Sequence, residues 1–321
     1  MLLLFDAFAI GKDDTSVSIT VPKDAKKSEI AAILKENGLI GSKTWFSLYT
    51  SLRGKEVKAR GGEYEIPKSS GFDGICLILS GKQNGTRTEV RVSIPEGSTI
   101  DDIIEIVCEK HKICSKEELV DTVQNGDFSQ YSFINSLDAT RGKRKYRLEG
   151  YLYPDTYSFY SDSSAYAVID RMLSNFEKKL DKRYLDACKK RGMTLDEAVT
   201  LGSIIMREGR YVSDYGKISS VFHNRLKSSA FAKRLQSDAT LVYVLGREMQ
   251  SADKELDSLY NTYKYGGLPP SPICSPDLNA ISYALTPDNT DYYYFVTKKD
   301  GTVLYAHDYN THLNNIKKAA N

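Results

Sequence analysis

The sequence has few cysteines and histidines, and none of them follows a metal-binding or disulfide-framework pattern. Its five cysteines are odd in number and include no CxxC pair, and its four histidines are scattered without an HExxH-like pair. Cys108, His111 and Cys114 lie close together in the chain, but this spacing is typical of a helix end rather than of a zinc knuckle. The sequence therefore predicts no metal site and no disulfide framework.

Charge of one sign and long apolar runs are also lacking. Lys and Arg number 44 against 42 Asp and Glu, which gives a net charge of +2 and argues against a nucleic-acid partner. The opening stretch, residues 1–14, is apolar for about ten residues and interrupted by Asp6, whereas a membrane-spanning helix needs about 20. It fits either the trimmed end of a membrane anchor or a remnant of cloning joined to a short strand.

The 321 residues leave room for two or three domains with a sizeable core. The chain has 22 tyrosines and a single tryptophan, and many of the tyrosines lie in the second half. A tyrosine has an apolar face and a hydrogen-bonding tip, which suits a polar ligand that contains rings. Ordinary use in strands and core accounts for most of them.

Two stretches of the first half share one pattern of strand, proline turn and amphipathic helix. VSITV at 17–21 precedes Pro22 and the helical pattern SEIAAILKENG, and VRVSI at 90–94 precedes Pro95 and STIDDIIEIVCEKH. We interpret 15–85 as a first small α+β module and 86–140 as a second one that resembles the LysM-type folds, which bind N-acetylated glycan chains. The basic run at 141–145 is predicted to be a solvated linker to a domain at 146–321.

One helix in that domain carries the chemistry. Thr194 and Glu197 form a capping-box start, apolar residues then recur at helical spacing, and Gly209 is a helix stop. Glu208 continues the apolar stripe at the C-terminal end of the helix. Burial and the helix macrodipole both raise the pKa of a carboxyl group in such a place, which suits a general acid. The alternative is a solvated glutamate in the last turn.

Further elements follow the same kind of pattern. Helices are predicted at 165–181, 194–208 and 213–227, with a closing helix from Tyr309. DYYYFVT and TVLYAHD are predicted to form two strands joined by a hairpin turn at 298–301.

Six motifs occur in order along the second half: EGYLYPDTY, SIIMRE, FHNRL, LQSDATLVY, YNTYKYGGLPPSPICSP and YYYFV. Together they resemble the YceG-like family of endolytic murein transglycosylases, over essentially the whole chain. The resemblance implies an α+β fold in which small LysM-like modules precede a mixed α+β catalytic domain. It implies cleavage of the MurNAc–GlcNAc bond in new peptidoglycan with 1,6-anhydro-MurNAc ends, without a cofactor. It also implies a single-pass membrane anchor, an extracytoplasmic catalytic domain, and cell-wall synthases as candidate partners.

The family's catalytic glutamate, at the end of the SII-x-x-E motif, falls on Glu208. Many relatives also have glutamate at the position of Met206, where this chain departs from them. Helical phase separates the two side chains by about 160° and places Glu208 on the apolar side. One carboxyl group is enough for this reaction, because the substrate's C6 hydroxyl replaces the water that a hydrolase must activate.

Residues in the matched motifs are candidates for substrate binding, each with a structural alternative. Asp155 could instead cap a turn, Glu149 could fix the site or form a salt bridge, and Arg225 is more often a tie between helix and loop. The candidates are Glu149, Tyr151, Asp155, Tyr157, Asn224, Arg225, Gln236, Ser237, Asp238, Tyr260, Asn261 and Tyr263.

Two rival functions remain open. A non-catalytic peptidoglycan-binding scaffold is favoured by Met206 and the LysM-like modules. A water-using glycosidase would need a second essential carboxylate, for which Glu149, Asp155 and Asp238 are candidates.

Overall fold

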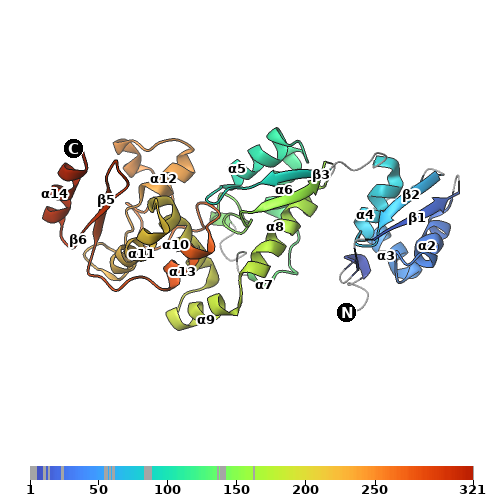
Figure 1. Ribbon diagram of the computed structural model, residues 1–321, viewed down its shortest axis with the longest axis horizontal. Helices are drawn as coiled ribbons and strands as arrows, with labels where there is room; N and C mark the ends of the chain where they lie inside the picture. The colour runs from blue at the N-terminus through green and yellow to red at the C-terminus, as the bar shows by residue number, and fades with distance from the viewer. Residues whose placement is uncertain are drawn as a thin grey trace. The chain divides into compact units, whose positions relative to one another are not determined.

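The computed structural model describes residues 6–9, 12–13, 15–22, 25–53, 57, 59, 62–82, 89–135, 137, 142–161 and 163–320. Much of the predicted N-terminal segment 1–14 therefore lies outside the described residues. The contacts divide the chain into two compact units, residues 1–88 and 89–321 (Figure 1). Each unit is described by itself.

The first unit is a two-stranded antiparallel sheet with helices. Strand β1 (Ser16–Val21) is followed by α2 (Lys27–Glu36), α3 (Lys43–Leu52), β2 (Gly62–Pro67), α4 (Phe72–Leu77) and a π-helical turn, η1 (Ile78–Lys82). β1 pairs with β2, and the apolar alternation of each strand faces a core of helix residues. The predicted strand and helix at the start of this module are confirmed.

The second unit opens with the same element order. Strand β3 (Glu89–Ser93) precedes α5 (Ile100–Ile104), which continues as the π-helix η2 (Glu105–Lys110), then α6 (Lys116–Asn125), α7 (Ser132–Asn135) and β4 (Thr156–Tyr160). β3 pairs antiparallel with β4, as β1 pairs with β2 in the first unit. The segment predicted as a LysM-like module thus shares a sheet with a strand beyond residue 140. Its LysM-like character and the boundaries drawn from sequence stay predictions.

A helical body follows. It contains α8 (Ala165–Lys179), α9 (Lys182–Arg191), α10 (Leu195–Glu208), α11 (Val212–Lys227), α12 (Asp238–Leu245), the 3-10 turn η4 (Ser251–Glu255) and α13 (Leu278–Leu285). The hairpin β5 (Tyr294–Thr297) and β6 (Val303–Ala306) and the closing helix α14 (Tyr309–Ala320) complete the unit. The predicted mixed α+β class is confirmed.

Helix α10 lies among α11, α12 and α13 (Figure 1). The predicted start is confirmed, because the Thr194 side chain accepts a hydrogen bond from the Glu197 backbone in a capping box. Ala198, Leu201 and the rest of the apolar stripe are buried. At Gly202, an added Cβ would lie 3.1 Å from the Ile281 nitrogen, so the missing side chain lets α13 approach closely.

The helix ends at Gly209 for a reason the sequence pattern did not give. Gly209 has φ −90°, which is extended rather than left-handed. Its small size is what matters, because an added Cβ would lie 2.7 Å from the Tyr215 ring. The sharp exit leaves Glu208 at the last position of the helix.

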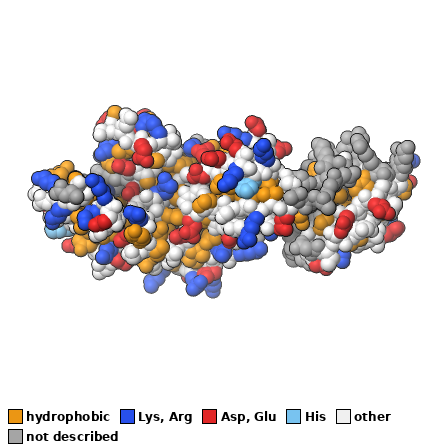
Figure 2. Space-filling model, turned by 45° about the horizontal axis from the view of Figure 1, so that its top comes forward, with side chains coloured by type: hydrophobic (Ala, Val, Ile, Leu, Met, Phe, Trp, Pro, Cys, Tyr) orange, Lys and Arg blue, Asp and Glu red, His pale blue; other side chains and the backbone are white. Residues whose placement is uncertain are grey.

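Surface charge is mixed in sign. On the face shown in Figure 2, Lys and Arg side chains are interspersed with Asp and Glu side chains. Within the described ranges, no helix combines the length and apolarity that crossing a membrane requires. In the same ranges, no three His, Cys, Asp or Glu side chains are grouped as metal ligands would be.

Candidate functional site

Glu208 ends α10 with its carboxyl group turned to the start of α12. The Ser237 hydroxyl donates a hydrogen bond of 2.6 Å to Glu208 Oε1. The Glu208 side chain is partly exposed, whereas Ser237 is 2% exposed. Burial of the carboxyl group raises the pKa of Glu208, and the charge of Asp238 acts in the same direction. The structure thus places the predicted acid where burial raises its pKa and a ligand can still reach it.

Three contacts oppose this rise in pKa. They are the Ser237 hydroxyl, the backbone N–H of Ala239 and the charge of Arg225. Ser237 and Ala239 belong to the N-terminal end of α12, where backbone N–H groups favour negative charge. The carboxylate that remains after proton loss therefore has stabilising partners.

Ser237 is fixed in place by a buried group of threonines. Its backbone N–H donates to Thr262 Oγ1 at 3.0 Å, and its carbonyl accepts from Thr240 Oγ1 at 2.9 Å. The two threonine hydroxyls are 3.1 Å apart, and both residues are buried. The loop before α12 is thereby bound to the loop at 258–272, and the Ser237 hydroxyl is held toward Glu208.

Asp238 and Tyr263, two of the predicted substrate residues, lie near Glu208, and a third, Gln236, precedes Ser237. The Tyr263 hydroxyl donates to Asp238 Oδ1, and Asp238 is exposed. Gln236 has φ +54°, a left-handed conformation that is uncommon for glutamine, and its N–H donates to the Thr262 carbonyl at 3.0 Å. Strained backbone of this kind is frequent at functional sites. Ser237, Asp238 and Tyr263 are predicted residues that the structure brings to Glu208, and Gln236 directly precedes Ser237.

Arg225 does not clamp the carboxyl group. Its Nε donates to the Tyr293 carbonyl at 2.7 Å and its Nη1 to the Leu235 carbonyl, and its guanidinium lies over the Phe231 and Tyr294 rings. Among the described residues, no ion pair includes Glu208. Arg225 therefore links α11 to the loop before α12 and to β5, as its structural alternative predicted. It affects Glu208 through its charge alone.

Met206 lies on another side of α10. Its terminal methyl group would be 3.5 Å from a Cβ added at Gly97, in the turn after β3. That turn is held by Gly97 N–H donating to the Ser275 carbonyl at 2.9 Å. A glutamate at the position of Met206 would therefore face the β3–α5 turn instead of Ser237.

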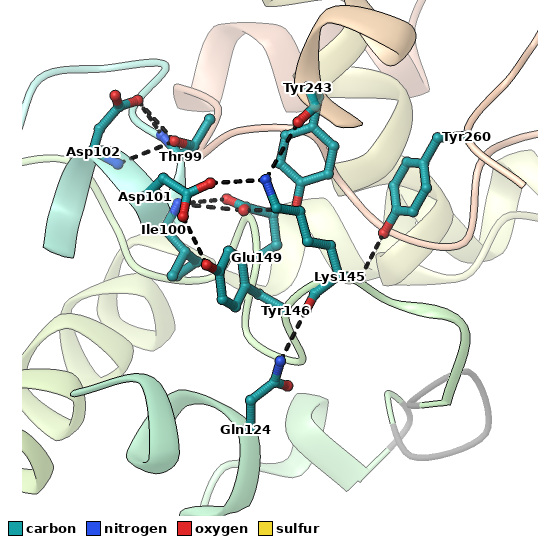
Figure 3. Close-up of polar contacts among 10 residues, drawn as sticks. All are labelled: Thr99, Ile100, Asp101, Asp102, Gln124, Lys145, Tyr146, Glu149, Tyr243 and Tyr260. Atoms are coloured by element: carbon teal, nitrogen blue, oxygen red, sulfur yellow. Dashed lines mark hydrogen bonds and ion pairs between the residues drawn. The ribbon is translucent and has the colours of Figure 1, made fainter. Parts of the chain in front are cut away.

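Glu149 is a second carboxyl group with a raised pKa, and it is enclosed (Figure 3). It is 0% exposed, and burial raises its pKa to about 8. The Ile100 N–H at the start of α5 donates to it at 3.1 Å, and the Tyr243 hydroxyl of α12 donates at 2.9 Å. The structure places Glu149 as a link between α5 and α12, and it does not reach the surface.

Lys145 lies beside this link (Figure 3). Its ammonium group is 2.8 Å from Asp101 Oδ2 and lies over the Tyr243 ring, 4.9 Å from its centroid. Its backbone N–H donates to the Tyr260 hydroxyl at 3.1 Å, and its carbonyl accepts from Gln124. The predicted solvated linker at 141–145 is therefore, at its described end, part of the folded structure.

Tyr151 is a correction to the predicted substrate set. It is 0% exposed, and its hydroxyl donates a hydrogen bond of 2.7 Å to Asp196. Asp196 also forms an ion pair with Arg144. Asp196 is in the first turn of α10, about 18 Å from Glu208 at the helical rise per residue. The tyrosine anchors the N-terminal end of α10.

Asp155 and Tyr157 are also away from Glu208. Asp155 accepts hydrogen bonds from the Thr156 N–H and from Asn175, as a turn cap does. Tyr157 lies in β4, is 5% exposed and bonds to the Tyr153 carbonyl. The structure supports the turn-cap alternative for Asp155 and a core role for Tyr157.

Asn224, Tyr260 and Asn261 serve the fold as well. The Asn224 amide donates to the Thr290 and Tyr292 carbonyls at 2.9 Å each. Tyr260 is 5% exposed and shares a hydrogen bond with Ser271, and Asn261 is 0% exposed and bonds to backbone groups of its own loop. Asn224 holds the segment before β5, and Tyr260 and Asn261 support loop 258–272 from inside.

Sequence reasoning missed Thr240 and Thr262, which hold Ser237, and Tyr243 and Lys145, which enclose Glu149. Both threonines stand inside motifs that had been noted, LQSDATLVY and YNTYKYGG. The position of Thr240 and Thr262 inside these motifs is the only sequence signal for their role, because the two hydroxyls come together only when the loops fold.

The arrangement can perform acid–base chemistry at one exposed group. Glu149 has no route to a ligand, while Glu208 combines a raised pKa with partial exposure and a hydroxyl partner. A single proton donor, with polar side chains on its open side, suits cleavage of a bond that carries a basic bridging oxygen.

Comparisons with known proteins found a family match and similar proteins. Residues 19–318 match the model of the YceG-like family. The endolytic murein transglycosylase of Bacillus subtilis strain 168 is 31% identical over 327 residues, covering 95% of this chain and 87% of that protein. The endolytic murein transglycosylase of Streptococcus pneumoniae D39 is 30% identical, covering 95% of this chain; the chain spans 58% of that protein's length. A crystal structure of a putative YceG-like protein from Listeria monocytogenes has a TM-score of 0.61 and 30% identity, covering 94% of this chain and 99% of that one.

Proposed function

Since the chain belongs to the YceG-like family, we propose that it is an endolytic murein transglycosylase that uses Glu208 as its acid and then its base. The observation that carries the assignment of Glu208 is its hydrogen bond to Ser237 at a partly exposed position where burial raises its pKa. The names of the curated relatives support the substrate class, which is murein.

The reaction follows from these groups. Protonated Glu208 gives its proton to the oxygen that bridges MurNAc and GlcNAc, and the bond from C1 to that oxygen breaks. The Glu208 carboxylate then takes the proton of the C6 hydroxyl of the same MurNAc, whose oxygen bonds to C1. The products are a new GlcNAc hydroxyl and a 1,6-anhydro-MurNAc end, and Glu208 is protonated again. No water, metal or cofactor enters the balance.

The contacts of Glu208 suit both halves of the cycle. Burial favours the neutral acid before the bond breaks. The Ser237 hydroxyl and the Ala239 N–H stabilise the carboxylate that forms, so that it persists until the C6 hydroxyl arrives. A general acid that must become a base needs this balance between the two charge states.

We also propose that the protein acts outside the cytoplasmic membrane, held by a single-pass anchor, because its substrate lies there. Enzymes that polymerise the same strands are candidate partners on the same ground. Fractionation of cells that produce the full-length protein, followed by protease treatment of intact protoplasts, tests the location. Protection of the catalytic part from the protease would contradict it.

Digestion of purified peptidoglycan tests the activity. Wild-type protein should release products whose ends are lighter by one water than hydrolysis products, as measured by mass spectrometry. Glu208→Gln should lower the rate by about 10²- to 10⁴-fold, the usual contribution of a general acid. Glu255→Gln is the matched control, because Glu255 is exposed on η4 and carries the same change.

The same assay separates the rival functions. A scaffold would bind the strands and release nothing, with folding intact. A water-using glycosidase would incorporate ¹⁸O from labelled water into its products, whereas the proposed reaction incorporates none. Either result would overturn the assignment of Glu208 as acid and base for a lytic reaction.

A further inference from the structure

A cavity of about 850 Å³ opens beside the opposite end of α10 from Glu208. It is lined by the first turns of α10, the end of α9, the end of α11 and loop 265–270, all within the second unit. Asp196, Thr200 and His223 lie in its wall, and Glu208 does not. The site already described does not account for it.

The cavity has an excess of positive charge. Four of its lining residues are cations: Lys143, Lys190, Arg191 and Lys227. All four are exposed, and among the described residues no side-chain hydrogen bond or ion pair is formed by their charged groups.

The two acids of the wall make other contacts, and two negative charges against four positive ones leave the lining with a net positive charge. Asp196 accepts hydrogen bonds from Arg144 and Tyr151. Glu197 accepts a hydrogen bond from the Thr194 N–H in the capping box. The positive charge therefore faces the cavity without a partner from the described part of the chain.

The one histidine of the wall adds no positive charge. Burial lowers the pKa of His223 to about 4, and the charges of Arg191 and Lys227 act in the same direction. Its Nε2 lies 2.8 Å from the Ala284 carbonyl, which fixes the ring.

Apolar side chains complete the lining. They are Met193, Leu226, Leu259, Leu268, Pro269 and Pro270. Cations at the rim of an apolar cavity suit a ligand that carries carboxylates on short aliphatic groups, because the carboxylates meet the cations while the aliphatic groups leave water.

We propose that this cavity binds the peptide stem of the murein strand through the stem's free carboxylates. The proposal rests on the proposed function, since it takes murein as the substrate. Stem peptides of murein combine free carboxylates with alanine methyl groups, which is the chemistry that the wall offers.

A murein stem peptide is long enough to span the distance between Glu208 and the cavity. Thr200 in the wall and Glu208 are eight positions apart on α10, about 12 Å along the helix axis. A peptide of about five residues spans up to about 17 Å when extended. A stem attached to a sugar at Glu208 is therefore long enough to enter the cavity. Loop 258–272 supplies Tyr263 near Glu208 and Tyr265 in the cavity wall, and so borders both places.

The test compares strands that carry stems with the same strands after an amidase has removed them. In Lys190→Ala/Arg191→Ala, we expect the KM for stem-bearing strands to rise about five- to tenfold more than the KM for stem-free strands, with kcat little changed. Lys182→Ala/Lys189→Ala is the matched control, because it removes the same charge from the same helix outside the cavity. An equal effect on both kinds of strand, or an effect of the control as large as that of the cavity variant, would overturn the proposal.

A binding experiment keeps this proposal separate from the proposed function. Isolated stem tetrapeptide is titrated into wild-type protein by calorimetry, and then the same peptide with its carboxylates amidated. Binding that is lost on amidation, and weakened in Lys190→Ala/Arg191→Ala, supports the cavity even if no strand is cleaved. Binding of a glycerol-phosphate polymer in the absence of stem binding would show an anion site of another kind and would overturn the assignment to the stem.

Discussion

Replacing Glu149 by glutamine should flatten the pH dependence of the stability of the second unit. Glu149 is 0% exposed, and burial raises its pKa from the ordinary 4.5 to about 8. Between these values the unfolded chain loses the proton while the folded chain keeps it, so the free energy of unfolding falls as the pH rises. A pKa shift of this size corresponds to a loss of about 5 kcal/mol across the window. Glutamine is neutral throughout, and its amide can accept from the Ile100 N–H and donate to the Tyr243 hydroxyl.

Urea unfolding at pH 5, 6, 7 and 8, followed by far-UV circular dichroism, measures the effect. The chain provides an internal control, because its single tryptophan, Trp45, lies in α3 of the first unit. Tryptophan fluorescence should therefore give the same transition in wild type and Glu149→Gln at each pH. The transition of the second unit should weaken between pH 5 and 8 much more in the wild type than in the variant.

Parallel pH profiles for the two proteins would refute the reasoning. They would mean that Glu149 is already ionised in the folded protein at pH 5, with Lys145 and the two hydrogen-bond donors compensating its burial. Lys145 is the charge that lowers the pKa of Glu149, and Asp101 is the charge that raises it. The outcome thus decides which charge state of Glu149 links α5 to α12.

Two other predictions concern Glu208. Ser237→Ala removes a hydrogen-bond donor that lowers the pKa of Glu208, so Glu208 should stay protonated to higher pH. The kcat should fall about tenfold, because the carboxylate formed in the reaction is less stabilised. A pH–rate profile whose alkaline limb does not move would contradict this. Met206→Glu should restore no activity to Glu208→Gln, because its side chain faces the turn at Gly97; recovery of product in the digestion assay would show that residue 206 can act as the acid.

Helix α10 was predictable from its sequence because its signals are local. Thr194 and Glu197 cap it, and the apolar stripe runs to Glu208 without interruption. Strand β4 was not predicted, because its partner β3 lies far away in sequence and the aromatic motif around it is also typical of a ligand wall. β3 was predictable from its own alternation, VRVSI, whereas the alternation of β4, TYSFY, was obscured by aromatic residues on both of its faces.

The candidate site was predictable in part. Glu208 follows from helical phase, and Ser237 and Asp238 follow from the matched motif next to α12. Tyr260 and Asn261 were interpreted as a sugar wall, yet they fill the inside of their loop. An aromatic or amide side chain beside a Gly-Pro segment serves either role, and only the packing of loop 258–272 distinguishes them.

Helix α12 connects the two carboxyl groups whose pKa values are raised. Its first residue, Asp238, follows the serine that binds Glu208, and Tyr243 near its other end binds Glu149. Ionisation of Glu149 above pH 8 places a charge in a closed site, and its burial destabilises the packing of α5 against α12 even though the Tyr243 hydroxyl favours the carboxylate. The alkaline loss of activity should then have two origins, and Glu149→Gln should retain only the one that belongs to Glu208. A kcat/KM profile from pH 6 to 9 that coincides for wild type and Glu149→Gln would show that α12 does not transmit the charge of one carboxyl group to the other.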